Sequence, residues 1–318
     1  MTLDRAKEEI IRRECFLVFA VWAAGCDRQN SDVASHSEDG PIIDAHLHAN
    51  NMEWVSSVAS IDSTWWPRDI PRPTDTDSLR EQTIRALAEA GVVRAVTSGP
   101  EVGRYVEADS TVIIPAVKIG SGVNLDTLRA AYERGAIRAF GETSWQYEGL
   151  SPADPRLDGL WSLAEDLDVP VGVHMGIGPP RWPELTSYRT SLGNPLELEE
   201  VIARHPRARI WVMHAGWPFL DEMVGLLYSS PSVYVDVAVI NWYLPRAEFH
   251  SYLRRLVEAG FTDRIMYGSD QMIWPASIPI GIEAIREAEF LTEAQRRAIL
   301  CENAARFFRL EATLCRRN

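Results

Sequence analysis

From Pro41 onward, short apolar runs rich in β-branched residues alternate with longer amphipathic stretches, and this unit repeats eight times. The runs cover residues 42–48, 92–98, 112–119, 137–143, 169–175, 209–215, 233–240 and 264–270. The stretches between them, such as 78–90, 125–134, 157–167 and 247–259, place apolar residues three and four positions apart, as amphipathic helices do. Strands that alternate with helices form parallel sheets whose faces the helices cover.

Eight such repeats within residues 41–318 favour a closed barrel over a doubly wound sheet, because no GxGxxG turn follows any of the runs. We therefore predict a single α/β domain over residues 41–318, folded as a (β/α)8 TIM barrel. The chemistry of such barrels lies at the C-terminal ends of the strands. Polar residues that close each strand are consequently the candidates for function.

The first forty residues have a different character. Residues 16–24 (FLVFAVWAA) are an apolar run of about half the length that a bilayer-spanning helix needs, which is typical of a signal peptide. The sequence Ala23-Ala24-Gly25-Cys26 that follows resembles the lipobox of bacterial lipoproteins. We predict a lipoprotein signal peptide over 1–25, lipidation of Cys26, and a flexible tether over 26–40. The alternative is a short helix with an incidental cysteine, since the charges before Cys26 sum to zero.

The predicted signal peptide implies a location in the bacterial cell envelope, on the periplasmic or extracytoplasmic side, with the lipid anchor as the only membrane contact. Cys301 and Cys315 could pair in such an oxidising compartment, but their spacing leaves this open. The chain has 32 Lys and Arg against 45 Asp and Glu, a net charge of −13. This balance argues against a nucleic-acid partner, which requires a basic surface, and favours a small-molecule substrate.

Several predicted strands end in residues that bind metals. His46 and His48 share one face of the first strand because side chains alternate along a strand. Four more candidates close strands four, five, six and eight: Glu142, His174, His214 and Asp270. Any one of these residues alone is more often a hydrogen-bonded core histidine or a helix cap.

Together, however, four imidazoles and two carboxylates at one rim would leave desolvated polar groups unpaired, at a cost on the order of kcal/mol each. A divalent metal ion would compensate them. Nitrogen and oxygen ligands without thiolates favour Zn²⁺, while Mn²⁺, Fe²⁺ and Ni²⁺ also fit.

These motifs resemble the amidohydrolase superfamily, and in particular its amidohydrolase-related (amidohydrolase 2-like) branch. The matching pieces are IIDAHLH at 42–48, VGVHMG at 171–176, VMHAGWP at 212–218, MYGSD at 266–270 and ILCENAARFFRL at 299–310. The resemblance covers residues 41–310 and implies a metal-dependent enzyme on a TIM barrel. It says less about the substrate, because one fold supports many reactions.

The resemblance also implies two possible ligand sets. A glutamate after strand four, as at Glu142, resembles relatives in which a carboxylate bridges two metal ions. His46, His48 and Asp270 would then hold one ion, and His174 and His214 the other. Alternatively, Glu142 bonds to Trp145 or caps the next segment, and His46, His48, His174 and Asp270 hold a single ion while His214 polarises the substrate.

The primary functional hypothesis is hydrolysis of an ester, lactone, amide or related bond of a small molecule by metal-activated water. Asp270 would accept the proton of this water and return it to the leaving group, with His214 as the second catalytic residue. One alternative is a mononuclear decarboxylase or hydratase of the same superfamily. Another is a non-catalytic metal-binding surface lipoprotein. A nuclease is disfavoured by the net charge of −13.

The rim also offers candidates for substrate binding. The chain has eleven tryptophans, and many of them follow the predicted strands, which predicts an aromatic-lined mouth. Among them we select Trp145, Trp217 and Trp242 as substrate-binding candidates. Lys118 closes the third strand and could bind a substrate carboxylate.

Overall fold

The computed structural model describes residues 40–53, 56 and 66–316. The predicted signal peptide, Cys26 and the tether up to residue 39 lie outside these residues, so these predictions remain untested by the structure. None of the described helices combines the length and the apolar character needed to cross a membrane.

The eight predicted strands are all present, all parallel, and hydrogen-bonded in chain order. They are β1 (Ile42–His48), β2 (Val92–Ser98), β3 (Ile113–Ile119), β4 (Ala139–Thr143), β5 (Val171–His174), β6 (Ile210–Met213), β7 (Tyr234–Asp236) and β8 (Ile265–Met266). Two backbone hydrogen bonds join the segment directly after β8 to β1: Ala45 N–H donates to Tyr267 O (2.9 Å) and Asp270 N–H donates to His46 O (2.7 Å). The sheet thus forms a nearly closed barrel, which confirms the predicted (β/α)8 fold.

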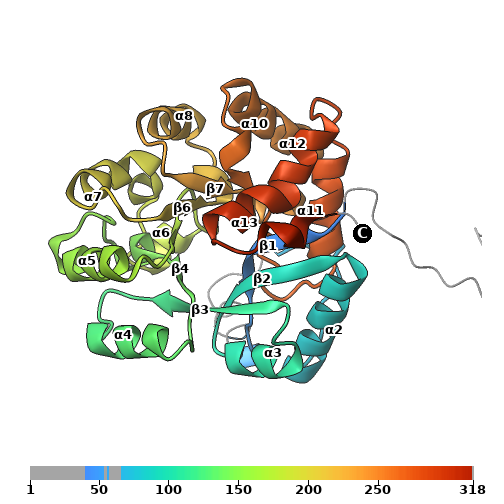
Figure 1. The fold of residues 1–318 in the computed structure, drawn as a ribbon, viewed down its shortest axis with the longest axis horizontal. Coiled ribbons are helices and arrows are strands. Elements are labelled where there is room, and N and C mark those ends of the chain that lie inside the picture. Colours follow the sequence, from blue (N-terminus) through green and yellow to red (C-terminus); the bar gives the residue numbers. More distant parts are fainter. Residues whose placement is uncertain (1–39, 54–55, 57–65, 317–318) are drawn as a thin grey trace, which may run out of the picture. The chain divides into compact units, whose positions relative to one another are not determined.

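The helices surround the strands (Figure 1). They are α2 (Thr76–Glu89), α3 (Val102–Ala108), α4 (Leu125–Glu133), α5 (Asp158–Leu167), α6 (Trp182–Leu185), α7 (Glu199–Arg204), α8 (Leu220–Ser229), α9 (Ile240–Tyr243), α10 (Arg246–Glu258), α11 (Ser277–Arg286), α12 (Glu293–Arg297) and α13 (Asn303–Phe307). Local sequence sets some of these starts, because Asp75 and Asn124 accept hydrogen bonds from the first turns of α2 and α4. The core fills the space between the strands and these helices.

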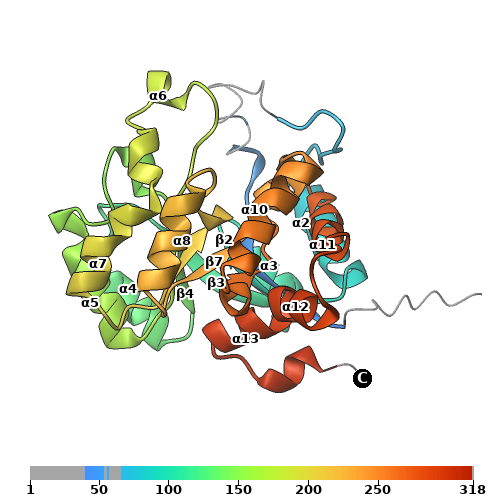
Figure 2. The same cartoon turned by 90° about the horizontal axis from the view of Figure 1, so that it is seen from above.

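A second apolar cluster fills the barrel interior and continues into the C-terminal helices. Phe307 and Phe308 pack edge-on against Trp211, with ring centroids 5.7 and 5.2 Å apart. A disulfide joins Cys301 to Cys315, the pairing that the sequence left open. Figure 2 shows α13 at one end of the barrel and α6 at the other. The C-terminal helices therefore close the end opposite the C-terminal strand ends.

The later strands end sooner than the sequence predicts, and side-chain hydrogen bonds give the reason. Strand β7 ends at Asp236 rather than at residue 240, because the Asp236 carboxylate accepts hydrogen bonds from the backbone N–H of Ala238 and of His214. Strand β6 ends at Met213, where the chain turns through His214 and Ala215 with φ of 59° and 47°. These early turns direct polar side chains into the barrel mouth.

Candidate metal centre

The structure brings all six predicted metal ligands together at the C-terminal end of the barrel. Each is buried, with 2–8% of its surface exposed: His46, His48, Glu142, His174, His214 and Asp270. They come from five different strands or the turns directly after them. Residues separated by more than 200 positions along the chain thus form one cluster.

One half of the cluster lies around the first strand. The Nε2 atoms of His46 and His48 are 3.3 Å apart, and His48 Nε2 lies 3.1 Å from Asp270 Oδ1. His46 Nε2 lies 4.0 Å from the same carboxylate oxygen. Three ligand atoms therefore converge on one point.

The other half consists of His174 and His214, whose Nδ1 and Nε2 atoms are 3.1 Å apart. Glu142 lies between the two halves. Its Oε1 atom contacts His174 Nδ1 and lies 3.9 Å from His214 Nε2, while its Oε2 atom lies 3.5 Å from His48 Nε2. One carboxylate thus presents one oxygen to each half.

These separations fit ligands of a divalent ion. Two ligand atoms at about 2.1 Å from a tetrahedral ion lie roughly 3.4 Å apart, and the closest pairs within each half are 3.1–3.3 Å apart. In addition, the buried Oδ1 atom of Asp270 has no hydrogen bond of acceptable geometry among the described residues. A cation would satisfy this oxygen, so the donor set fits one or two ions.

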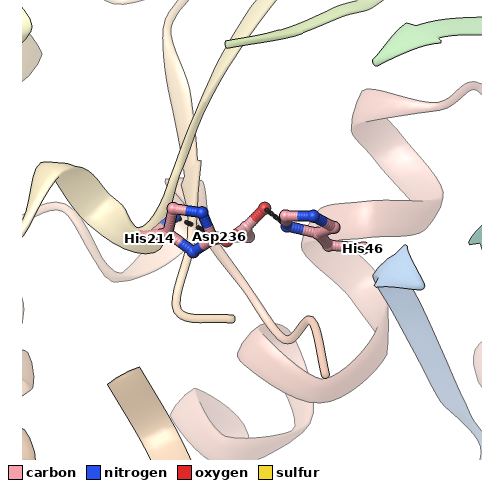
Figure 3. A group of neighbouring side chains, drawn as sticks. All are labelled: His46, His214 and Asp236. Carbon is pink, nitrogen blue, oxygen red and sulfur yellow. Dashed lines mark hydrogen bonds and ion pairs between the residues drawn. The ribbon is translucent and has the colours of Figure 1, made fainter. Parts of the chain in front are cut away.

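Asp236, at the end of β7, positions two of the histidines (Figure 3). Its Oδ2 atom lies 3.3 Å from His46 Nδ1 and also accepts a hydrogen bond from Trp211 Nε1 (3.2 Å). Its Oδ1 atom accepts the backbone N–H of His214 (2.9 Å). Because both oxygens are used in this way, Asp236 orients His46 and leaves Nε2 facing the cluster.

The remaining ring nitrogens of the second half also have partners. His214 Nδ1 lies 3.1 Å from the carbonyl oxygen of Ala238, to which it can donate. His174 Nε2 lies 3.3 Å from the hydroxyl of Tyr147, which stacks beside the ring at a centroid distance of 5.2 Å. Because His214 Nδ1 can donate to this carbonyl, its Nε2 atom is left facing the cluster, and His174 presents Nδ1 to Glu142.

The backbone is strained at two of the ligands. His214 and Asp270 have φ of 59° and 44°, in the left-handed region that costs a non-glycine residue of order 1 kcal/mol or more. Such strain persists where the surrounding structure fixes it, and it is concentrated at functional sites.

The cluster attracts positive charge. Burial alone lowers the pKa of His46, but the carboxylates of Asp270 and Asp236 outweigh it and raise the pKa to about 10. Burial alone raises the pKa of Glu142, but His174 and His214 outweigh it and hold that pKa well below its ordinary value. Carboxylates that stay ionised in a buried site are suited to bind a cation.

The four residues selected for substrate binding lie in different surroundings. Lys118 is half-exposed at the end of β3, with Nζ 3.9 Å from Glu142 Oε2. Trp145 is buried and packs edge-on against Trp161. Trp242 is buried and donates its indole N–H to Ser269 O (2.6 Å), and Trp217 points toward Glu248 (3.5 Å). Of these four, only Lys118 forms an ion pair with a residue of the cluster.

The sequence interpretation missed Asp236 and Tyr147. Asp236 lay inside a strand predicted to continue to residue 240, so it was not considered a strand-end residue. A carboxylate followed by small residues at the end of the seventh run (DVAV) was the available signal. Tyr147 lies four residues beyond the end of β4, and nothing in the sequence relates it to His174.

The family model described as Amidohydrolase matches residues 43–310, and the chain belongs to this family. It is an enzyme of the amidohydrolase superfamily, and its described residues include groups of histidines and carboxylates that could hold a divalent ion. Protein fluG of Emericella nidulans is a curated relative, 25% identical over 167 residues, which are 48% of this chain and 18% of that protein. The chain therefore spans less than a fifth of that relative's length.

Solved structures show the same fold. An uncharacterised TIM-barrel protein from Bordetella bronchiseptica aligns with a TM-score of 0.66 and 18% identity, over 85% of this chain and 98% of its own. A probable 2-pyrone-4,6-dicarboxylic acid hydrolase from Acinetobacter baumannii, with citric acid bound, aligns with a TM-score of 0.60 and 15% identity. The alignment covers 85% of this chain and 99% of that one. A 5-carboxyvanillate decarboxylase from Novosphingobium aromaticivorans, complexed with manganese, aligns with a TM-score of 0.61 and 12% identity. The alignment covers 86% of this chain and 97% of that one. At these identities the comparison establishes the fold alone.

Proposed function

We propose that this protein is a binuclear metal-dependent hydrolase that cleaves an ester, lactone, amide or related bond of a small molecule. The observation that carries this proposal is the position of Glu142, whose two carboxylate oxygens face separate pairs of histidines. His46, His48 and Asp270 would hold one ion, His174 and His214 the other, with Glu142 between them. When bound, such ions acidify water and polarise a carbonyl oxygen.

The protein's own groups would manage the proton. Asp270 directs Oδ1 into the cluster, and its Oδ2 atom lies 4.0 Å from His214 Nδ1. Asp270 would accept the proton of the attacking water and return it to the leaving group. With two ions bound, His214 would act as a ligand through Nε2, whereas with a single ion it would polarise the substrate. Lys118 is positioned to hold an anionic group of the substrate, because it is half-exposed beside Glu142. Trp217, which is partly exposed, is proposed to contact the substrate, while the buried Trp145 and Trp242 would support the wall of the barrel mouth.

The first test is metal content by elemental analysis of the wild-type chain and of Glu142→Ala, with Glu287→Ala as a control at an exposed glutamate on the outer helix layer. We expect two ions per chain in the wild type and in the control, and one or none in Glu142→Ala. Zinc is the metal we expect first, although manganese in a similar decarboxylase makes Mn²⁺ the next to test. Ester, lactone and amide panels then follow.

A mononuclear decarboxylase is the second candidate, and the contact of Lys118 with Glu142 favours it. An ammonium 3.9 Å from Glu142 Oε2 can neutralise that carboxylate without a metal ion, so that a single ion suffices for the remaining ligands. One ion in both the wild type and Glu142→Ala would support this candidate over the hydrolase. Decarboxylation of carboxylic acids would then be assayed before hydrolysis.

We also propose that the protein is a lipoprotein of the bacterial cell envelope, anchored through Cys26. The disulfide between Cys301 and Cys315 supports an oxidising compartment, since such bonds are rare in the cytosol. Detergent phase partition of the protein from bacterial cells tests this proposal. The wild type should enter the detergent phase and Cys26→Ala the aqueous phase, whereas equal partition would contradict an anchor at Cys26.

A further inference from the structure

A pocket of about 750 Å³ lies at the N-terminal end of the barrel, opposite the candidate metal centre. It is formed by the C-terminal helices and the segment after them, near α13 in Figure 2. Its charged lining consists of three arginines and one acid: Arg297, Arg306, Arg316 and Glu302. Arg306 places the pocket at this end of the barrel, because it hydrogen-bonds to Tyr234 at the beginning of β7 and to Asp263 just before β8.

Arg306 is held in a fixed orientation by neutral groups. Its Nε atom donates to the hydroxyl of Tyr234 (3.1 Å), and its Nη2 atom donates to the carbonyl of Asp263 (2.6 Å) and the side-chain oxygen of Asn303 (2.8 Å). Within residues 66–316, Arg306 forms no ion pair, and its Nη1 atom makes no hydrogen bond. The guanidinium is therefore oriented in advance while its charge is uncompensated.

The two other arginines leave the pocket with excess positive charge. Arg297 pairs with Glu302, with both Nε and Nη2 2.8 Å from Oε1. Arg316 is exposed and forms no ion pair with any other described residue. Three arginines and one glutamate thus line the pocket, on a chain whose net charge is −13. A concave site with two uncompensated positive charges is suited to a dianion.

We propose that this pocket binds a phosphate group, carried either by a soluble phosphoester or by the headgroup of a membrane phospholipid. Guanidinium groups bind phosphate oxygens through paired, charge-assisted hydrogen bonds. The volume exceeds that of phosphate alone, and the rest of the wall is small and apolar, including Ala305, Leu310 and Cys315. This wall, which the disulfide to Cys301 ties in place, would accommodate the organic part of the ligand.

Calorimetric titration of the full chain with inorganic phosphate at constant ionic strength tests the proposal. We expect saturable binding by the wild type and an affinity at least about tenfold lower in the double variant Arg306→Gln/Arg316→Gln, because two charged hydrogen-bond donors are lost. Arg104→Gln, at an exposed arginine on α3, serves as the matched control and should bind like the wild type. Arg316→Gln alone, at an exposed side chain that forms no hydrogen bond or ion pair among the described residues, should still weaken binding if the double variant fails to fold.

A second measurement separates the two sources of phosphate. The same proteins are sedimented with phosphatidylcholine vesicles, with and without phosphatidylglycerol. Phosphate-sensitive binding to the anionic vesicles that the double variant loses would support a phospholipid headgroup, and phosphate binding without vesicle binding would support a soluble phosphoester. The proposal is overturned if the wild type binds neither probe, or if the arginine variants bind phosphate as tightly as the wild type.

Discussion

At the scale of single residues, Asp236 acts on the metal centre through the histidines that it orients. Replacing it with Asn removes the negative charge beside His46 Nδ1 but retains an oxygen for the backbone N–H groups of His214 and Ala238. We expect Asp236→Asn to fold and to bind its metal about 10–100-fold more weakly, the usual effect of removing such a partner. Competition with a chromophoric chelator measures this affinity, and Asp166→Asn on the surface is the control. An unchanged affinity would mean that His46 does not need this carboxylate.

Tyr147 differs from Asp236 in that it contacts His174 through a neutral hydroxyl. Its ring is held by Trp182 and Tyr188, at centroid distances of 5.0 and 5.2 Å, so that Tyr147→Phe should keep the ring in place. We expect this variant to retain its fold and the first ion but to lose affinity for the ion at His174, by about tenfold. Metal titration followed by elemental analysis distinguishes the two ions. A wild-type titration curve would rule out a role for the hydroxyl.

Tyr105 provides a prediction about pH, away from the metal centre. Burial raises its pKa to about 12, although Thr83 and Arg80 nearby act in the opposite direction. The pKa of Tyr105 is about 10 in the unfolded chain and higher in the folded protein, so folding favours the protonated phenol. The contribution of Tyr105 to stability is therefore intact below pH 10 and is lost as the pH rises through about 12. Tyr105→Phe should therefore change stability little at neutral pH, and should avoid a loss of up to roughly 3 kcal/mol in strong alkali.

Urea unfolding near neutral pH and at about pH 11 measures this difference, since the phenolate is then partly formed in the unfolded chain. The control is Tyr228→Phe, at a tyrosine that is 83% exposed and should unfold like the wild type at both pH values. If Tyr105→Phe and the wild type lose the same stability in alkali, burial of this phenol is not responsible.

At the scale of elements, the strands were predictable and their ends were not. The eight apolar runs identified every strand because a parallel barrel buries both faces of its strands, which leaves a continuous apolar signal. The ends depend on groups far away in sequence: β7 stops where Asp236 accepts the N–H of His214 in the turn after β6, and the chain turns after β8 where Asp44 Oδ1 accepts the N–H of Ser269. No local pattern contains these contacts. The six metal-ligand candidates were found because they close predicted strands, whereas Asp236 was missed because its strand was predicted to continue to residue 240.

The C-terminal segment, from α12 to the 3₁₀ turn at Ala312–Cys315, contains the described disulfide and allows a prediction for an element. Cys301 and Cys315 are 14 residues apart, and closing a loop of this length in the unfolded chain contributes about 3 kcal/mol. We expect Cys315→Ser to unfold at lower urea concentration by an amount equivalent to about 2–4 kcal/mol. In reducing buffer the wild type should lose this advantage and unfold like the variant. A difference that persists under reduction would indicate that packing at Cys315, rather than the disulfide, is responsible.

At the scale of the whole molecule, the barrel places its two charged regions at opposite ends. The C-terminal strand ends collect carboxylates and histidines, while the N-terminal end collects the arginines of the C-terminal helices. A net charge of −13 therefore conceals an uneven distribution, which residue counts alone cannot reveal. The two regions share no residue.

Because the metal ligands come from strands β1, β4, β5, β6 and β8 or the turns after them, bound metal should stabilise the fold as a whole. A ligand present at about a hundred times its Kd adds roughly 2.7 kcal/mol to the free energy of unfolding, which for a chain of this size raises Tm by about 4–5 °C. We expect a chelator to lower Tm by this amount and added Zn²⁺ or Mn²⁺ to restore it. His48→Ala should show a smaller response, because it loses a ligand of one ion, and Asp166→Asn should respond like the wild type. A Tm that is independent of metal in all three proteins would mean that these strand ends meet without holding an ion, and the hydrolase proposal would fail with it.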